Sequence, residues 1–153
     1  MKQLPLSVEI TDKRDMRTQF AALCYRVKDG ETQVLMITSR RTGRWIIPKG
    51  WPMDGKTPGD CALTEAWEEA GVKGKVTGGC LALYTYVKGV SAEEQLPCAV
   101  MVYPVRVKSL AKKYPESDER KRRWMSPKAA SKRVDEPELA HLLRKFDAKR
   151  LVA

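Results

Sequence analysis

Three glutamates, Glu65, Glu68 and Glu69, are the residues of this chain best placed to do chemistry. Their spacing of three and four puts them on one face of a helix, where like charges repel. Two of them also lie in the last turn before Gly71, at the negative end of the helix dipole, which favours cations. A solvated acidic face is the simpler alternative, but a local rule broken without local gain is typical of a functional site. Because Mg²⁺ takes carboxylate oxygens together with substrate phosphates, the sequence predicts a metal site here.

The helix that carries the glutamates has clear start and stop signals. Thr57 is a good N-cap, Pro58 suits the first turn, and Asp60 completes a pattern like a capping box. Gly71 suits the left-handed residue just past the end. We therefore expect a helix over 58–70. Its other side gathers residues that pack closely against a sheet, namely Ala62, Leu63, Ala66, Trp67 and Ala70.

The flanking segments predict the sheet on which this helix packs. Residues 18–27 and 32–38 are rich in β-formers and flank the turn sequence KDGE, which predicts a hairpin. Further short strands are expected at 44–48, 78–87, 97–107 and 122–126. Residues 136–151 carry Leu139, Leu142, Leu143 and Phe146 at helical spacing, which predicts an amphipathic closing helix. The order of elements is that of an α/β protein with a mixed sheet and helices packed on it.

Length and composition place the chain in an ordinary class of proteins. Its 153 residues, 42% hydrophobic and 31% charged, are expected to form one globular domain over 1–153. It has no run of about 20 apolar residues that could span a bilayer and no apolar signal-peptide core at its N-terminus. The four cysteines lack CxxC spacing and lie far from the single histidine, which argues against zinc. A cytoplasmic location with reduced thiols is expected.

The net charge of +10 indicates an anionic partner rich in phosphate. Arginines concentrate in two expected loops, SRRTGR at 39–44 and ERKRR at 119–123. Aromatic residues are few and do not alternate with these basic runs, so a stacking surface for single-stranded nucleic acid is not favoured. We therefore expect a small anionic substrate, and neither a membrane nor, as first choice, a nucleic acid as partner.

Residues 50–72, GWPMDGKTPGDCALTEAWEEAGV, resemble the signature of the Nudix hydrolases, G-x5-E-x7-R-E-U-x-E-E-x-G-U, where U is apolar. The residues in register are Gly50, Glu65, Ala66, Glu68, Glu69, Gly71 and Val72. The resemblance implies an α/β/α sandwich around a mixed sheet. The segments SRRTGRWIIPKG, EEAGVKGKV and RKRRW are similar to the branch that hydrolyses diphosphoinositol polyphosphates and dinucleoside polyphosphates.

Two positions depart from the Nudix pattern. Lys56 stands in place of the first glutamate, and Thr64 stands in place of the arginine that in the family orients a neighbouring glutamate. Threonine cannot replace a guanidinium fork. Two hypotheses follow: an arginine from elsewhere takes over this role, or the Lys56 ammonium reaches the glutamate and compensates.

The resemblance implies Mg²⁺-dependent hydrolysis of a phosphoanhydride bond, with Mn²⁺ as an alternative metal. The implied metal ligands are Glu65, Glu69 and the backbone carbonyl of Lys49. Glu68 is the expected proton acceptor, with Glu65, Glu93 and Glu94 in reserve. Ser39, Arg40, Arg41 and Arg120 are the expected contacts to outer phosphates, because arginine's planar fork suits phosphate oxygens.

Two other functions remain open at this point. The same chemistry could act on the 5′ triphosphate of RNA, where an extended basic surface should make binding steeply salt-dependent. Alternatively, the departures at Lys56 and Thr64 could leave a catalytically weak module that only binds nucleotides. The three intact glutamates argue against this second reading, because a pure sensor has little need for mutually repelling carboxylates.

Overall fold

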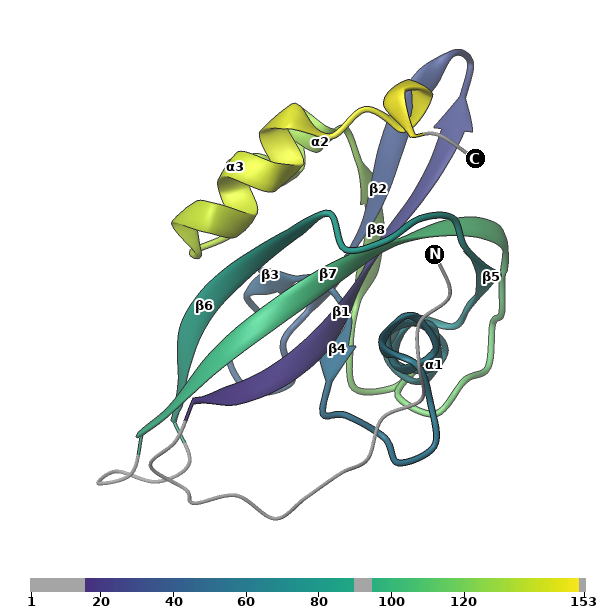
Figure 1. The fold of residues 1–153 in the computed structure, drawn as a ribbon. Helices are drawn as coiled ribbons and strands as arrows, with labels where there is room; N and C mark the ends of the chain where they lie inside the picture. Colours follow the sequence, from purple (N-terminus) through teal and green to yellow (C-terminus); the bar gives the residue numbers. More distant parts are fainter. Residues whose placement is uncertain (1–15, 90–94, 152–153) are drawn as a thin grey trace.

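The computed structural model describes residues 16–89 and 95–151 and confirms a mixed α/β fold (Figure 1). The strands are β1 (Arg17–Lys28), β2 (Glu31–Thr38), β3 (Trp45–Ile46), β4 (Lys49–Gly50), β5 (Val72–Val76), β6 (Ala82–Gly89), β7 (Gln95–Leu110) and β8 (Arg122–Met125). The helices are α1 (Pro58–Ala70), α2 (Pro127–Ser131) and α3 (Pro137–Lys145), followed by the 3₁₀ turn η1 (Ala148–Arg150). None of these helices is long and apolar enough to cross a membrane.

One eight-stranded sheet joins all of these strands. Its main path runs β3-β2-β1-β7-β5, with β4 paired to β1, β6 to β7 and β8 to β2. The pair β1–β7 is parallel and the other pairs are antiparallel, so the sheet is mixed. The expected hairpin joins β1 to β2 through Asp29 and Gly30, which both have positive φ, as a two-residue primed turn requires.

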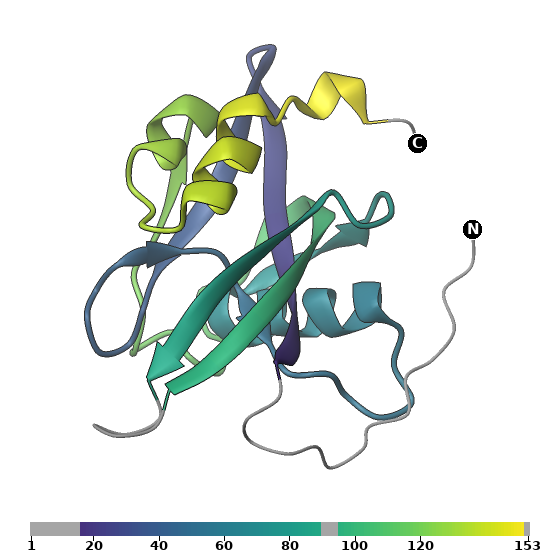
Figure 2. The same ribbon diagram turned by 60° about the vertical axis from the view of Figure 1, so that its left-hand side comes forward.

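Helices cover both faces of the sheet, as Figures 1 and 2 show. Strand β1 explains why, because side chains alternate between the two faces of a strand and β1 is apolar on both. Ala21, Leu23 and Tyr25 belong to the core under α2 and α3. Phe20 and Cys24 belong to the second core, under α1. The expected α/β/α sandwich is therefore confirmed.

Helix α1 begins and ends where its capping residues predict. The Thr57 side chain accepts a hydrogen bond from the backbone N–H of Asp60, and Gly71 adopts the left-handed conformation with φ 67°. Fully buried Ala62, Ala66 and Ala70 allow the close approach to the sheet.

Some elements differ from the sequence expectation. Strands β4 and β5 and the five-residue helix α2 were not expected, because each is short. Strands β4 and β5 also owe their structure to pairing with the distant strands β1 and β7. The strand expected from residue 78 begins at Ala82, and β7 extends beyond the expected strand at both ends. The closing helix stops at Lys145, after which Phe146 is extended and Asp147 caps η1.

Candidate active site

A cleft of about 270 Å³ brings most of the expected site residues together. It lies between α1, strands β3, β4 and β6, and the loops before β3 and β8. Its lining consists of Gln19, Arg40, Ile46, Lys49, Gly50, Trp51, Glu65, Glu69, Tyr86, Lys88, Glu116 and Arg120. The two sequence segments that contribute most, 46–51 and 65–69, both fall within the motif or directly before it.

Strand β4 and helix α1 approach each other closely at this cleft. A Cβ atom on Gly50 would collide with the carboxyl group of Glu65, so a larger residue here would displace that carboxylate. The backbone N–H of Lys49 donates a hydrogen bond to Oε1 of Glu69 across 3.3 Å. Because β4 pairs with β1, with Phe20 opposite Gly50, this contact ties the acidic helix to the centre of the sheet.

The acidic pair Glu65 and Glu69 is electrostatically unfavourable without a cation. Burial, followed by the charge and hydrogen bonding of Glu69, raises the pKa of Glu65 to about 8. Burial also raises the pKa of Glu69, against the opposing effect of Arg120. Glu116 adds a third carboxylate whose charge raises the pKa of both.

This donor set fits a hard divalent cation. Two carboxylates held together with raised pKa values are neutralised either by protons or by a metal, and Mg²⁺ takes one or two protein carboxylates. In residues 16–89 and 95–151, no three Asp, Glu, His or Cys side chains form a complete metal cage. The remaining coordination would therefore come from backbone, water and substrate oxygens, which Mg²⁺ commonly uses.

Arg120 holds two of the carboxylates from outside the motif. Its guanidinium, only 8% exposed, places Nη2 3.7 Å from Glu69 and Nε 3.1 Å from Glu116. Nη1 donates to the backbone carbonyl of Thr38 at 3.0 Å. An arginine from the loop before β8 thus reaches the acidic cluster, as one of the two hypotheses for the missing motif arginine requires.

The structure does not support the other hypothesis, in which the Lys56 ammonium reaches a glutamate of the acidic cluster. The Lys56 ammonium donates to Oγ1 of Thr64 at 2.8 Å, and Thr64 in turn donates to the Asp60 carbonyl. The two residues that depart from the pattern therefore contact each other on an exposed turn of α1. Neither lines the cleft.

A cation also reaches the negative end of α1. The helix has no basic residue in its last turn, but Nη1 of Arg122 in β8 donates to the Ala70 carbonyl at 2.8 Å. The backbone N–H of Glu116 donates to the Glu68 carbonyl at 3.0 Å. Residues distant in sequence thus satisfy carbonyls that the helix leaves unpaired.

The remaining expected residues lie around the cleft with different degrees of involvement. Arg40 lines it and is 59% exposed, with Nε 3.7 Å from Glu116. Ser39 shapes the same loop by bonding Thr42 and the N–H of Arg44. Arg41 is exposed, and neither it nor the Glu68 side chain is part of the lining. Glu93 and Glu94 lie outside the described residues.

Sequence reasoning missed Trp51, Tyr86, Lys88 and Glu116 as cleft residues. Glu116 had a usable signal, because it lies four residues before Arg120, which was expected at the site. Tyr86 and Lys88 are two residues apart in β6 and therefore lie on the same face of the strand. Whether that face reaches the cleft depends on the register between β6 and β7.

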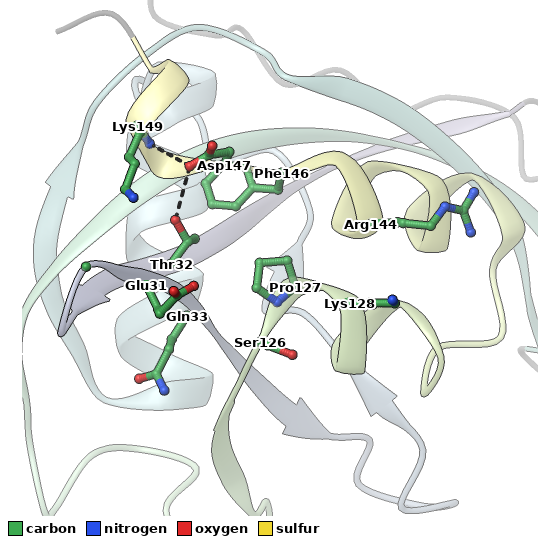
Figure 3. A pocket seen from close by; sticks show the side chains of 11 residues that line it. Glu31, Thr32, Gln33, Ser126, Pro127, Lys128, Arg144, Phe146, Asp147 and Lys149 are labelled. Atoms are coloured by element: carbon green, nitrogen blue, oxygen red, sulfur yellow. Dashed lines mark hydrogen bonds between the residues drawn. The ribbon is translucent and has the colours of Figure 1, made fainter.

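A second, larger hollow of about 550 Å³ lies between the start of β2, the start of α2 and the segment around Phe146 and Asp147 (Figure 3). Some of its polar groups are bonded to one another. Thr32 donates to Asp147 and accepts from the N–H of Ala148, while Asp147 caps Lys149. No residue expected at the site lines this hollow, so the smaller cleft is the candidate active site.

Comparisons with known proteins find a matching domain family and curated relatives. Residues 17–146 match the profile of the NUDIX domain. The human diphosphoinositol polyphosphate phosphohydrolase 3-alpha is 33% identical, over 86% of this chain and 77% of its own length. The mouse diphosphoinositol polyphosphate phosphohydrolase 2 is 30% identical, over 86% and 70%.

Solved structures share the fold. The crystal structure of an Ap4A hydrolase from C. elegans has a TM-score of 0.65 and 22% identity, covering 88% of this chain and 98% of that chain. The E. coli dihydroneopterin triphosphate pyrophosphohydrolase has a TM-score of 0.63 and 15% identity, covering 86% and 96%. The domain match includes every residue of the cleft and the curated relatives are phosphohydrolases, so this chain belongs to the Nudix family of pyrophosphohydrolases.

Proposed function

We propose that this Nudix pyrophosphohydrolase catalyses the Mg²⁺-dependent hydrolysis of a phosphoanhydride bond in a nucleoside diphosphate-linked or polyphosphate substrate. The supporting observation is the mixed lining of one cleft, which combines the Glu65–Glu69 pair with basic side chains of Arg40, Lys49 and Lys88. Carboxylates suit Mg²⁺ and cations suit phosphate oxygens. A complex of metal and phosphate therefore finds partners for both of its components in the same place.

Two substrate classes fit this proposal. The curated relatives are named for diphosphoinositol polyphosphates, and dinucleoside polyphosphates present the same kind of phosphoanhydride chain. Both are highly anionic small molecules, as the net charge of +10 favours.

The proposed metal ligands are Glu65, Glu69 and the backbone carbonyl of Lys49. When bound there, Mg²⁺ neutralises pyrophosphate oxygens and makes a water more acidic. Arg120 keeps the Glu69 carboxylate in place through its buried fork and also lines the cleft. Arg40 and Arg120, with Ser39 and Arg41 on the adjoining loop, are the proposed contacts to phosphates.

The proton acceptor is proposed to be one of two glutamates on α1. Glu68 is the residue expected from the sequence. Glu65 lines the cleft beside Glu69, which makes it the alternative base if it does not hold the metal. Replacing the true base should lower kcat by roughly 10²- to 10⁴-fold, so kcat values of Glu65→Gln and Glu68→Gln identify it.

A substrate panel tests the proposed reaction. Diadenosine polyphosphates, diphosphoinositol polyphosphates, ADP-ribose, nucleoside triphosphates and triphosphorylated RNA are incubated with the protein and Mg²⁺, and products are identified by chromatography. We expect hydrolysis of a polyphosphate class, abolished by EDTA. The proposal is wrong if no member of the panel is cleaved, or if triphosphorylated RNA alone is cleaved.

A matched pair of variants assigns the activity to the cleft. Glu69→Gln removes a charge from the acidic pair, whereas Glu119→Gln removes the same charge from an exposed position three residues from Glu116. We expect a loss of at least 10²-fold in kcat/KM for Glu69→Gln and a change below about 2-fold for Glu119→Gln. Equal activities of the two variants would place the chemistry elsewhere.

A further inference from the structure

Trp51 is a large apolar side chain left open at the rim of the cleft. It directly follows Gly50, lines the same cleft as Glu65 and Glu69, and is 40% exposed. Fully burying a large apolar side chain is favourable by roughly 1.5–3 kcal/mol. An indole left partly open beside a polar cleft therefore provides contact surface for a ligand.

Cations accompany the aromatic rings on this side of the cleft. Nζ of Lys88 lies 5.3 Å from the ring centroid of Trp51, and Nζ of Lys49 lies 5.1 Å from that of Tyr86. Because Tyr86 and Lys88 are two residues apart in β6, both point to the same face of the sheet. The wall of the cleft thus places each aromatic ring next to a lysine ammonium group, which suits a ligand that is both aromatic and anionic.

The charges of the cleft do not suit a ligand with phosphates on every side. Its lining holds four cations against three carboxylates. Arg120 is bonded to Glu69 and Glu116, and Arg40 also lies near Glu116. A saturated inositol ring with phosphates around it offers no π-face to Trp51, and its phosphates outnumber the four cations of the cleft. A linear phosphate chain ending in a nucleoside needs fewer.

We propose that Trp51, with Lys88 beside it, is the platform on which a nucleobase stacks, and that the substrate is a dinucleoside polyphosphate rather than a diphosphoinositol polyphosphate. This inference rests on the proposed phosphoanhydride hydrolysis and names its substrate class. The phosphates next to the base lie within reach of the Lys88 ammonium, while the chain extends toward Glu65 and Glu69. Stacking on an aromatic side chain strengthens binding by roughly 5- to 150-fold per base.

Kinetics of Trp51 variants on three substrates test the proposal. The substrates are diadenosine tetraphosphate, a diphosphoinositol pentakisphosphate and inorganic tetraphosphate, which has no base. For Trp51→Leu, which keeps an apolar side chain without a ring, we expect kcat/KM on diadenosine tetraphosphate to fall roughly 5- to 150-fold. Losses on the other two substrates should be at least fivefold smaller. Trp51→Phe should retain most of the activity, because it keeps a stacking face.

A control variant and a binding measurement complete the design. Val87→Ala shortens another exposed apolar side chain, on the face of β6 opposite Tyr86 and Lys88, and should change no rate by more than about 2-fold. In stopped-flow mixing with Mg²⁺ present, diadenosine tetraphosphate should quench tryptophan fluorescence of the wild type before turnover, and Trp51→Phe should abolish most of this quenching.

The outcomes separate the two proposals. If the wild type cleaves none of the three substrates but cleaves another small-molecule member of the earlier panel, this inference is wrong and the proposed hydrolysis stands; cleavage of no panel member overturns both. If it cleaves the three substrates and Trp51→Leu loses the same factor on all three, Trp51 does not recognise a base. Faster cleavage of the diphosphoinositol substrate than of diadenosine tetraphosphate by the wild type would also overturn the inference.

Discussion

Replacing Arg120 by glutamine should destabilise the protein far more than its position in a loop suggests. The guanidinium is 8% exposed and bonds the Thr38 carbonyl at 3.0 Å and Glu116 at 3.1 Å, with Glu69 3.7 Å away. Breaking a buried ion pair by removing one partner costs about 3–5 kcal/mol, because a buried charge is left uncompensated. The long contact to Glu69 and the partial exposure of Glu116 favour the lower end, about 3 kcal/mol. For a chain of this size that corresponds to a melting temperature lower by about 6–12 °C.

The assay is thermal unfolding in EDTA, monitored by circular dichroism, with Lys121→Gln as the control. Lys121 is the next residue in the chain and has the same charge, but its side chain is exposed. Its replacement should therefore change the free energy of unfolding by less than about 0.5 kcal/mol. In the Arg120→Gln protein, excess Mg²⁺ should narrow the gap to wild type, because a bound cation again neutralises Glu69. Equal melting temperatures of Arg120→Gln and Lys121→Gln in EDTA would refute the assigned role.

Three further predictions follow from the geometry of the cleft. Gly50→Ala should lower both melting temperature and kcat/KM, at least tenfold for the latter, because the added Cβ collides with the Glu65 carboxyl group. Without metal, thermal unfolding measured across pH should show that stability falls between about pH 4.5 and 8. The reason is that Glu65 keeps its proton up to about pH 8 in the folded protein but loses it near pH 4.5 in the unfolded chain. Glu65→Gln should flatten this pH dependence, and an unchanged slope would contradict the raised pKa. Arg40→Ala should raise KM for substrates with four or more phosphates more than for ADP-ribose, and equal effects in steady-state kinetics would exclude an outer-phosphate contact.

The acidic helix was predictable because local residues determine it. Thr57 and Gly71 satisfy the helix ends through contacts within a few residues, and the alanines on one side specify close packing. The three glutamates identified the site because their mutual repulsion has no local compensation. Its compensation comes instead from Arg120, which no helical spacing relates to α1, while Arg122 satisfies a carbonyl at the end of the helix.

The other half of the cleft was not predictable from spacing. Trp51 belongs to the motif segment, but its exposure is known only once the neighbouring strands are placed. Lys88 reaches the cleft because β6 pairs with β7 in one particular register, from Ala82 opposite Val102 to Gly89 opposite Gln95. A shift of one residue would turn Lys88 to the other face of the sheet. Lys56 and Thr64 were singled out from the sequence as departures from the motif, but the hydrogen bond between them was not predicted.

The central claim is that Glu65 and Glu69 form a metal site, and a Mg²⁺ titration of the melting temperature tests it most directly. A ligand that binds only the folded state at about 100 times its Kd stabilises the protein by about 2.7 kcal/mol, or about 5–11 °C for a chain of this size. We predict a rise of this order for the wild type in millimolar Mg²⁺, an unchanged rise for Glu119→Gln, and loss of most of it for Glu69→Gln. A wild-type melting temperature that stays constant throughout the titration would contradict the account.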